Sequence, residues 1–164
     1  MFENLLVGCG TMVVCLTLQC IVVYILLLVL LALEKRQFIS PTLIRTSFIL
    51  VVTMVILFAG NLLQITLWAE LFVLCGEFEE YSTAFYHSVV NFTTLGYGDV
   101  VMAEKRRLLG ALEAANGVLM FALTSGVIFS IFYELAERAW KLGLGRLEEA
   151  GRSQHETALG AERK

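Results

Sequence analysis

Residues 93–100 combine threonine, glycine and tyrosine in an order that suits the binding of a bare cation. They read TTLGYGDV. Gly96 and Gly98 flank Tyr97, and glycine tolerates left-handed backbone dihedral angles that few other residues adopt. The segment can therefore turn successive carbonyl groups toward one axis. A column of carbonyl oxygens, with the Thr94 hydroxyl at its base, can replace the water around a dehydrated monovalent cation.

This segment resembles the selectivity filter of potassium channels, because two threonines precede the glycine–tyrosine–glycine and an aspartate follows it. Leu95 stands where valine is commoner in this family, but only its carbonyl needs to face the ion. The resemblance is to the prokaryotic-type, two-helix pore class, here with an extra N-terminal transmembrane helix. It implies an ion-binding filter made of Thr94, Leu95, Gly96, Tyr97 and Gly98, in which Thr94, Leu95, Gly96 and Tyr97 hold K+.

The composition is that of an integral membrane protein. The chain has 164 residues, of which 58% are hydrophobic, a mean hydropathy of +0.77 and a single proline. Residues 12–33, 48–75 and 108–132 are each long enough to cross a hydrocarbon core of about 30 Å. The segment from residue 77 to the filter is too short and too polar to do so. We predict a re-entrant helix there, from Tyr81 to about Thr93.

The predicted fold is therefore all-α, with three transmembrane helices, a re-entrant pore helix and a filter loop. One chain supplies one filter strand, and potassium-channel filters use four, so we expect a four-fold homotetramer. We divide the chain into an N-terminal helix with its cytoplasmic loop (1–45), a pore domain (46–135) and a short cytoplasmic tail (136–164). The tail beyond Leu147 is polar and is predicted to be disordered.

The distribution of lysine and arginine predicts the orientation. Nine of the twelve basic residues lie in the first loop and the C-terminal tail, and cytoplasmic segments carry an excess of such residues. We therefore expect a multi-pass protein of the plasma membrane (a bacterial-type inner membrane), with the N-terminus outside and the C-terminus in the cytoplasm. The three exceptions, at 105–107, fall on the outer side. The resemblance implies the same orientation, since its filter aspartate faces the exterior.

Residues that adjoin the filter are predicted to support it. The filter tyrosine of potassium channels points away from the axis and packs on aromatic residues of the pore helix, and the resemblance gives this role to Tyr97. The predicted support residues are Thr93, Asp99, Tyr86, Phe92, Glu113 and Asn116.

Glu113 is an ionisable residue within the last membrane helix, with Asn116 close by. A carboxyl group in the membrane is costly and suggests a function. We favour a hydrogen bond to His87, Ser88 or Asn91 of the pore helix over direct contact with permeating ions.

The last membrane helix is predicted to line the pore. Gly117 lies eighteen residues after Asp99, where the resemblance places a hinge glycine. Gly117 also shares a small-residue face with Gly110 and Ala114, so close helix packing is an equal alternative. The predicted pore-lining or gate residues, spaced by four, are Phe121, Ser125, Phe129 and Tyr133, the last two forming a hydrophobic constriction.

On the second helix, Asn61, Gln64 and Trp68 share one face. Polar side chains in a membrane helix usually turn toward protein, so this face is expected to meet the pore-lining helix.

The predicted function is a potassium-selective channel that conducts K+ passively. The predicted partners are potassium ions, membrane lipid and three further copies of the chain, with no nucleic acid. We expect no enzyme and no cofactor beyond the permeant K+, since no nucleophile–base pair or metal-ligand spacing appears, including among the four cysteines. The main alternative is a non-selective monovalent cation channel, against which Tyr97 argues. A potassium-transporter subunit would need four filter repeats in one chain, and a non-conducting subunit would not need an intact filter.

Overall fold

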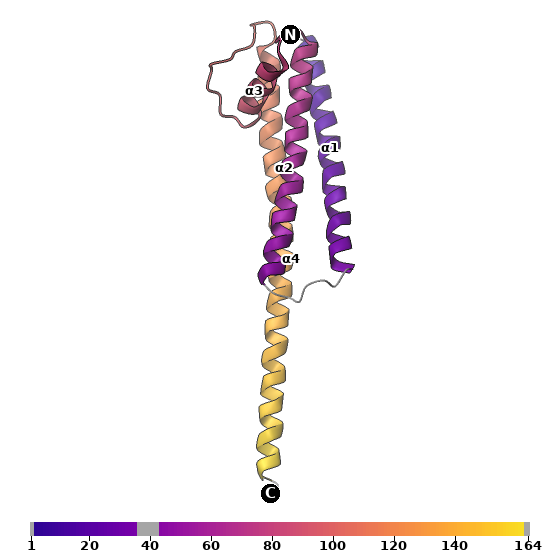
Figure 1. Ribbon diagram of the computed structural model, residues 1–164, viewed down its shortest axis with the longest axis vertical. Helices are drawn as coiled ribbons and strands as arrows, with labels where there is room; N and C mark the ends of the chain where they lie inside the picture. Colours follow the sequence, from indigo (N-terminus) through magenta and orange to yellow (C-terminus); the bar gives the residue numbers. More distant parts are fainter. Residues whose placement is uncertain (1, 36–42, 163–164) are drawn as a thin grey trace.

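The computed structural model describes the backbone of residues 2–35 and 43–162 (Figure 1). Within these ranges it describes every side chain except those of residues 34–35, 43, 45 and 142–162. These residues form four helices: α1 (Phe2–Lys35), α2 (Leu43–Leu74), α3 (Tyr81–Phe92) and α4 (Arg107–Glu162). No strand occurs in the described part of the chain. The predicted all-α fold is confirmed.

Three of the helices are long and apolar enough to cross a membrane, over Phe2–Leu33, Thr46–Leu74 and Arg107–Lys141. They match the three predicted segments, so this is a multi-pass membrane protein. The first helix begins ten residues earlier than the predicted start at Met12. Its additional turns contain one charged residue, Glu3, which lies in the first turn, where negative charge stabilises a helix.

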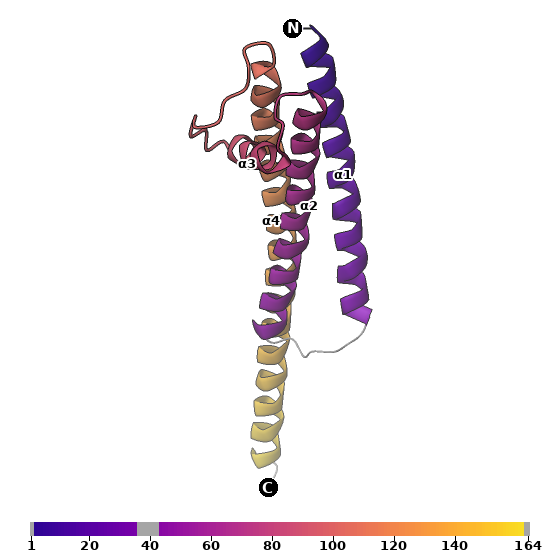
Figure 2. The ribbon, with the colours of Figure 1, turned by 45° about the horizontal axis from the view of Figure 1, so that its top comes forward.

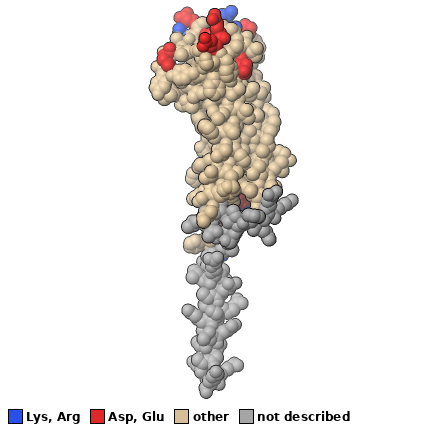
Figure 3. Space-filling model, viewed as in Figure 1, with Lys and Arg blue, Asp and Glu red and all other residues tan. Residues whose placement is uncertain are grey.

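The long helices α1, α2 and α4 run side by side, and the short α3 lies near one end of the bundle (Figure 1). In the turned view α3 crosses the direction of the long helices, and the N-terminus of α1 lies at the same end (Figure 2). We call this end, which carries α3 and residues 93–106, the filter end. Charged side chains gather on it, whereas most of the visible body below is uncharged (Figure 3).

The largest apolar core lies at the filter end, between α3 and the long helices. Trp68 and Phe72 of α2 are fully buried, with ring centroids 6.0 Å apart, and Phe92 at the end of α3 is fully buried as well. The other buried members of this core are Cys15, Ile65, Ala69, Ala84, Met102, Leu109 and Met120. The helices α2 and α4 pack directly against α3, and α1 packs against α2 and α4.

A buried polar tether joins α1 to the other two long helices. The Gln64 side-chain amide donates to Gln19 Oε1 over 2.9 Å, and the Gln19 amide donates to the Thr124 hydroxyl over 3.5 Å. The predicted polar face of α2 is indeed buried, but the partner of Gln64 lies on α1 and not on the pore-lining helix. An amide in the membrane is stabilised by another hydrogen-bonding side chain, and α1 supplies it.

We expect the substitution Gln19→Leu to destabilise the protein by about 0.6–2 kcal/mol, since it removes both bonds and leaves the Gln64 amide without its acceptor. Thermal unfolding in detergent micelles measures the change. Thr17→Val is the matched control on the same helix, because the exposed Thr17 hydroxyl bonds only to the Val13 carbonyl one turn earlier. Equal stability of the two variants would show that the two hydrogen bonds of Gln19 do not stabilise the protein.

The C-terminal part of α4 continues as a single helix to Glu162 and projects beyond the bundle (Figure 1). The prediction that the tail beyond Leu147 is disordered is therefore wrong. The tail extends a helix that the membrane segment has already nucleated, and it contains strong helix formers such as the Leu-Glu-Glu-Ala run at 147–150. Ion pairs between side chains four residues apart, Glu134–Arg138 and Glu137–Lys141, support the helix where it leaves the bundle.

Candidate ion-conducting site

The backbone of the predicted filter segment alternates between left-handed and ordinary dihedral angles. The angle φ is +59° at Thr94, +59° at Gly96 and +76° at Gly98, whereas Leu95 and Tyr97 between them avoid positive values. Such an alternation allows successive carbonyl groups to lie along one side of the chain. Thr94 takes a conformation that costs a residue with a Cβ about 1–2 kcal/mol, so the surrounding structure must hold it there.

The carbonyl oxygens of this segment are free of intramolecular hydrogen bonds. Within the described part of the chain, no donor reaches the carbonyl oxygen of any residue from 94 to 98. Residues 94–98 are also exposed in the single chain. These oxygens are available as ligands for an ion.

The first end of the filter is anchored to the last turn of α3. The backbone N–H of Thr94 donates to the Asn91 carbonyl over 2.8 Å, and that of Leu95 donates to the Val90 carbonyl over 2.9 Å. The Thr93 hydroxyl donates to the Val89 carbonyl over 2.8 Å. These bonds use the N–H groups at the base of the filter and leave its carbonyls free.

The other end of the filter is anchored to the same helix. The Tyr86 hydroxyl donates to the Asp99 carboxylate over 2.8 Å. This bond lowers the pKa of the Asp99 carboxyl below its ordinary value, so Asp99 stays ionised at neutral pH. The stabilisation is present above the ordinary pKa and is lost only as the pH falls through the lowered one. Both ends of the filter thus take their positions from α3.

Glu113 of α4 reaches the back of the pore helix. Its side chain is fully buried, and the Ser88 hydroxyl of α3 hydrogen-bonds to its carboxyl group. The Ser88 oxygen also lies 2.9 Å from the Ile65 carbonyl of α2. Ser88 is one of the three partners expected from the sequence, and the contact joins α2, α3 and α4 at one point. Asn116, fully buried one turn later, lies on the same stretch of α4.

At Gly117, α4 approaches the end of α3 closely. A Cβ atom added there would collide with the backbone carbonyl oxygen of Phe92, the last residue of α3. The Phe121 ring, one turn further along α4, packs edge-on against the Phe92 ring at a centroid distance of 5.7 Å. α4 passes Gly117 without interruption. The sequence left a hinge and close helix packing as alternatives for Gly117, and in this structure Gly117 is a site of close packing.

The segment that contains all these features matches a known family. The model of a family described as an ion channel covers residues 46–134, more than half of the chain. The chain belongs to this ion channel family. No solved structure matches it.

The predicted lining residues of this channel lie on one exposed face of α4. Phe129 and Tyr133 are 76% and 69% exposed, and Ser125 is exposed too, while Phe121 is partly covered by its contact with Phe92. Neither α1 nor α2 covers this face, and its place at the pore remains a prediction.

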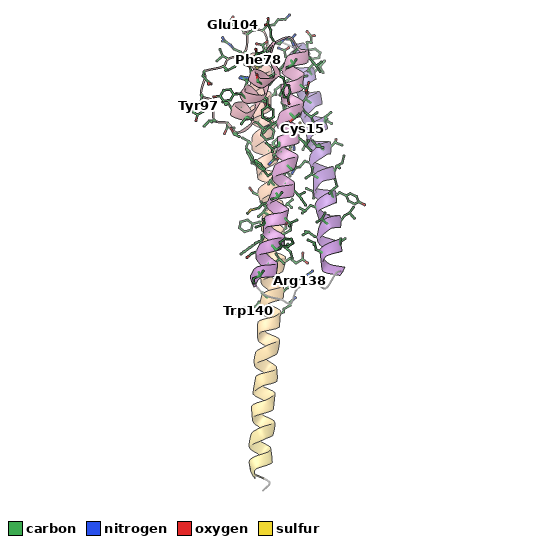
Figure 4. All side chains as sticks on the ribbon, viewed as in Figure 1. Cys15, Phe78, Tyr97, Glu104, Arg138 and Trp140 are labelled. Carbon is green, nitrogen blue, oxygen red and sulfur yellow. The ribbon has the colours of Figure 1, made fainter. Side chains whose placement is uncertain are left out.

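Tyr97 projects from the filter loop away from the bundle (Figure 4). Its side chain is 68% exposed and contacts no aromatic ring in the described part of the chain. The predicted packing of Tyr97 on pore-helix aromatics is therefore absent within one chain. Any such packing requires the pore helix of a neighbouring copy.

Contacts at the filter end also involve residues that sequence reasoning missed. The Glu77 carboxylate accepts a hydrogen bond from the backbone N–H of Ala103 and pairs with Arg106 at 3.9 Å. The Asn4 amide of α1 donates to the Lys105 carbonyl. These contacts fix the loop that follows the filter and give Arg106 an acidic partner. The opposite charges of Glu77 and Arg106 were a signal in the sequence, but nothing there showed that their loops meet.

Proposed function

We propose that this channel is selective for potassium and conducts K+ passively across the plasma membrane through a central pore made by four copies of the chain. The observation that carries the proposal is the segment at residues 94–98, with its left-handed residues at alternate positions and its unpaired carbonyl oxygens. Carbonyl oxygens arranged in a ring replace the hydration shell of K+. The ligands would be the carbonyls of Thr94, Leu95, Gly96 and Tyr97, with the Thr94 hydroxyl at the base.

The tetramer follows from the environment of this segment. Unpaired backbone carbonyls that faced lipid would each cost several kcal/mol, so they need a water- or ion-filled axis enclosed by protein. One chain supplies one wall of such an axis. Four copies would bring four such segments together and would cover the exposed Tyr97 and the exposed face of α4.

Selectivity for K+ requires that the spacing of the carbonyls be held. The filter is tied to α3 at both ends, through the N–H groups of Thr94 and Leu95 and through the Tyr86–Asp99 bond. The pore helix is in turn held by Glu113 and by the contact at Gly117. These ties support a filter of defined diameter in place of a wide, non-selective pore.

The test is the reversal potential of the purified channel in a planar bilayer, with K+ on one side and Na+ on the other. We expect a value near the potassium equilibrium potential. A clear current that reverses near zero would establish the non-selective cation channel instead. Native mass spectrometry in detergent tests the assembly separately, and a monomer or dimer as the largest species would contradict the tetramer.

A further inference from the structure

His87 of α3 occupies an apolar position directly behind the outer end of the filter. Its side chain is 6% exposed, and its ring lies between those of Phe72 and Phe78, at centroid distances of 5.6 and 5.1 Å. One ring nitrogen, Nδ1, lies 3.0 Å from the Val100 carbonyl, just beyond Asp99. The other, Nε2, lies 2.8 Å from the Asn91 amide nitrogen on the next turn of α3.

These two contacts determine which nitrogen carries the proton. The Val100 carbonyl is only an acceptor, so Nδ1 must donate a proton to it. The Asn91 NH2 group is only a donor, so Nε2 must accept with its lone pair. Both contacts are satisfied by the neutral ring protonated at Nδ1. A second proton on Nε2 would oppose the NH2 donor and break the contact with Asn91.

The charged groups around the ring come from three parts of the fold. Glu77 before α3 and Asp99 after the filter are negative and favour a charged imidazole. Arg107 of α4 lines the same hollow as His87. Its positive charge disfavours a charged imidazole. Glu113 of α4 lies beside Asn91, so it influences the His87 imidazole only through the Asn91 amide.

Water can reach the ring through a hollow of about 290 Å³ between α3, the filter loop and α4. Its lining includes His87, Asn91, Gly98 and Val100. Protons from the bath on the filter side therefore have a route to Nε2.

We propose that His87 is a proton-sensitive positioning residue that holds the outer end of the filter when neutral and releases it when protonated. This inference rests on the proposed potassium channel and names a regulation of the same filter. Burial opposes the charged ring, and a proton on Nε2 would face the Asn91 NH2 donor, so the charged ring moves toward water and withdraws its bond from Val100. Residues 98–100 then lose an anchor, and acid on the filter side reduces the K+ current.

The pH range follows from the surroundings of the ring. Burial lowers the pKa of His87 from its ordinary value of 6.5, although the Val100 carbonyl and the charges of Glu77 and Asp99 raise it in part. The native filter therefore favours the neutral ring. This stabilisation is complete above about pH 6.5 and is lost as the pH falls below that value.

The first experiment compares K+ currents at about pH 8 and about pH 5 in the bath on the filter side. We expect the current of the native channel to fall roughly tenfold over this range. The chain has two histidines, which gives a matched pair of variants. His155→Asn should keep the fall, and His87→Asn, whose amide nitrogen takes the place of Nδ1 and still offers a donor to Val100 but does not titrate, should abolish it. An equal fall in His87→Asn would overturn the proposal and leave the potassium channel intact.

The second measurement needs no current and so separates the two proposals. In the His155→Asn protein labelled with nitrogen-15 in the imidazole, His87 gives the only histidine signal. We expect a neutral ring protonated at Nδ1 at neutral pH and a second protonation below about pH 6.5. A ring protonated at Nε2, or one that stays neutral down to about pH 5, would overturn the proposal whatever the current does. Absence of K+-selective current at pH 8 would count against the channel proposal alone.

Discussion

Gly117→Ala should abolish potassium current and lower the stability of the protein, although it adds a single methyl group. The new Cβ would overlap the Phe92 carbonyl oxygen, which is backbone and cannot rotate away as a side chain can. Phe92 is joined directly to Thr93 and the filter, so relief of the collision moves the filter or separates α4 from α3. Overpacking of this kind costs about 1–3 kcal/mol.

Gly126→Ala is the control on the same helix, because a Cβ there meets nothing within 4 Å in the chain. Since alanine favours a helix over glycine by about 1 kcal/mol, this variant should be as stable as the native protein or more so. Potassium currents in planar bilayers and thermal unfolding in detergent decide the comparison. If Gly117→Ala conducts normally while Gly126→Ala does not, the essential glycine is a hinge further down α4 and not the contact with α3.

Glu113→Ala should be the second most damaging change. It removes the carboxyl group that Ser88 contacts and leaves a cavity at the point where α2, α3 and α4 meet. Loss of a buried hydrogen-bond partner costs about 1–3 kcal/mol, and the cavity adds to this. We expect a lower unfolding temperature in detergent and a filter with weaker discrimination between K+ and Na+.

The Glu113→Gln variant distinguishes two roles of Glu113, which are support of α3 through Ser88 and direct action of its charge on ions. The amide has nearly the same size and can still hydrogen-bond with Ser88, so stability and selectivity should stay close to native. If Glu113→Gln loses selectivity as fully as Glu113→Ala, the negative charge itself acts on permeating ions, and the supporting role is insufficient.

The backbone conformation of the predicted filter segment could be anticipated in part from the sequence, because it depends on local chemistry. Glycine at 96 and 98 predicts positive φ at these positions, and both have it. Thr94 also takes positive φ, and this could not be predicted from the sequence. A β-branched residue adopts such a conformation only when its surroundings impose it. Here the bond from its own N–H to Asn91 contributes to that constraint.

The partners of the membrane polar residues were harder to predict. The helical spacing of Gln64 and Trp68 indicated a buried face, and both are buried, but the face meets Gln19 of α1. Periodicity shows which side of a helix is buried and does not show which neighbour covers it. For the same reason, the sequence offered three possible hydrogen-bond partners for Glu113 and could not show that Ser88 is the one in contact.

The sequence by itself determined that this is a helical membrane protein with three spans, a short helix between the last two, and glycines in left-handed conformations after it, because hydrophobic length and glycine placement are properties of short segments. Only the tertiary structure decided what holds the predicted filter segment. Tyr86 and Asp99, His87 and Val100, and Gly117 and Phe92 are separated by 13 to 25 positions along the chain. The first two pairs meet because residues 99–100 fold back onto α3, and the third because α4 packs against the end of α3. No local pattern in the sequence records either arrangement.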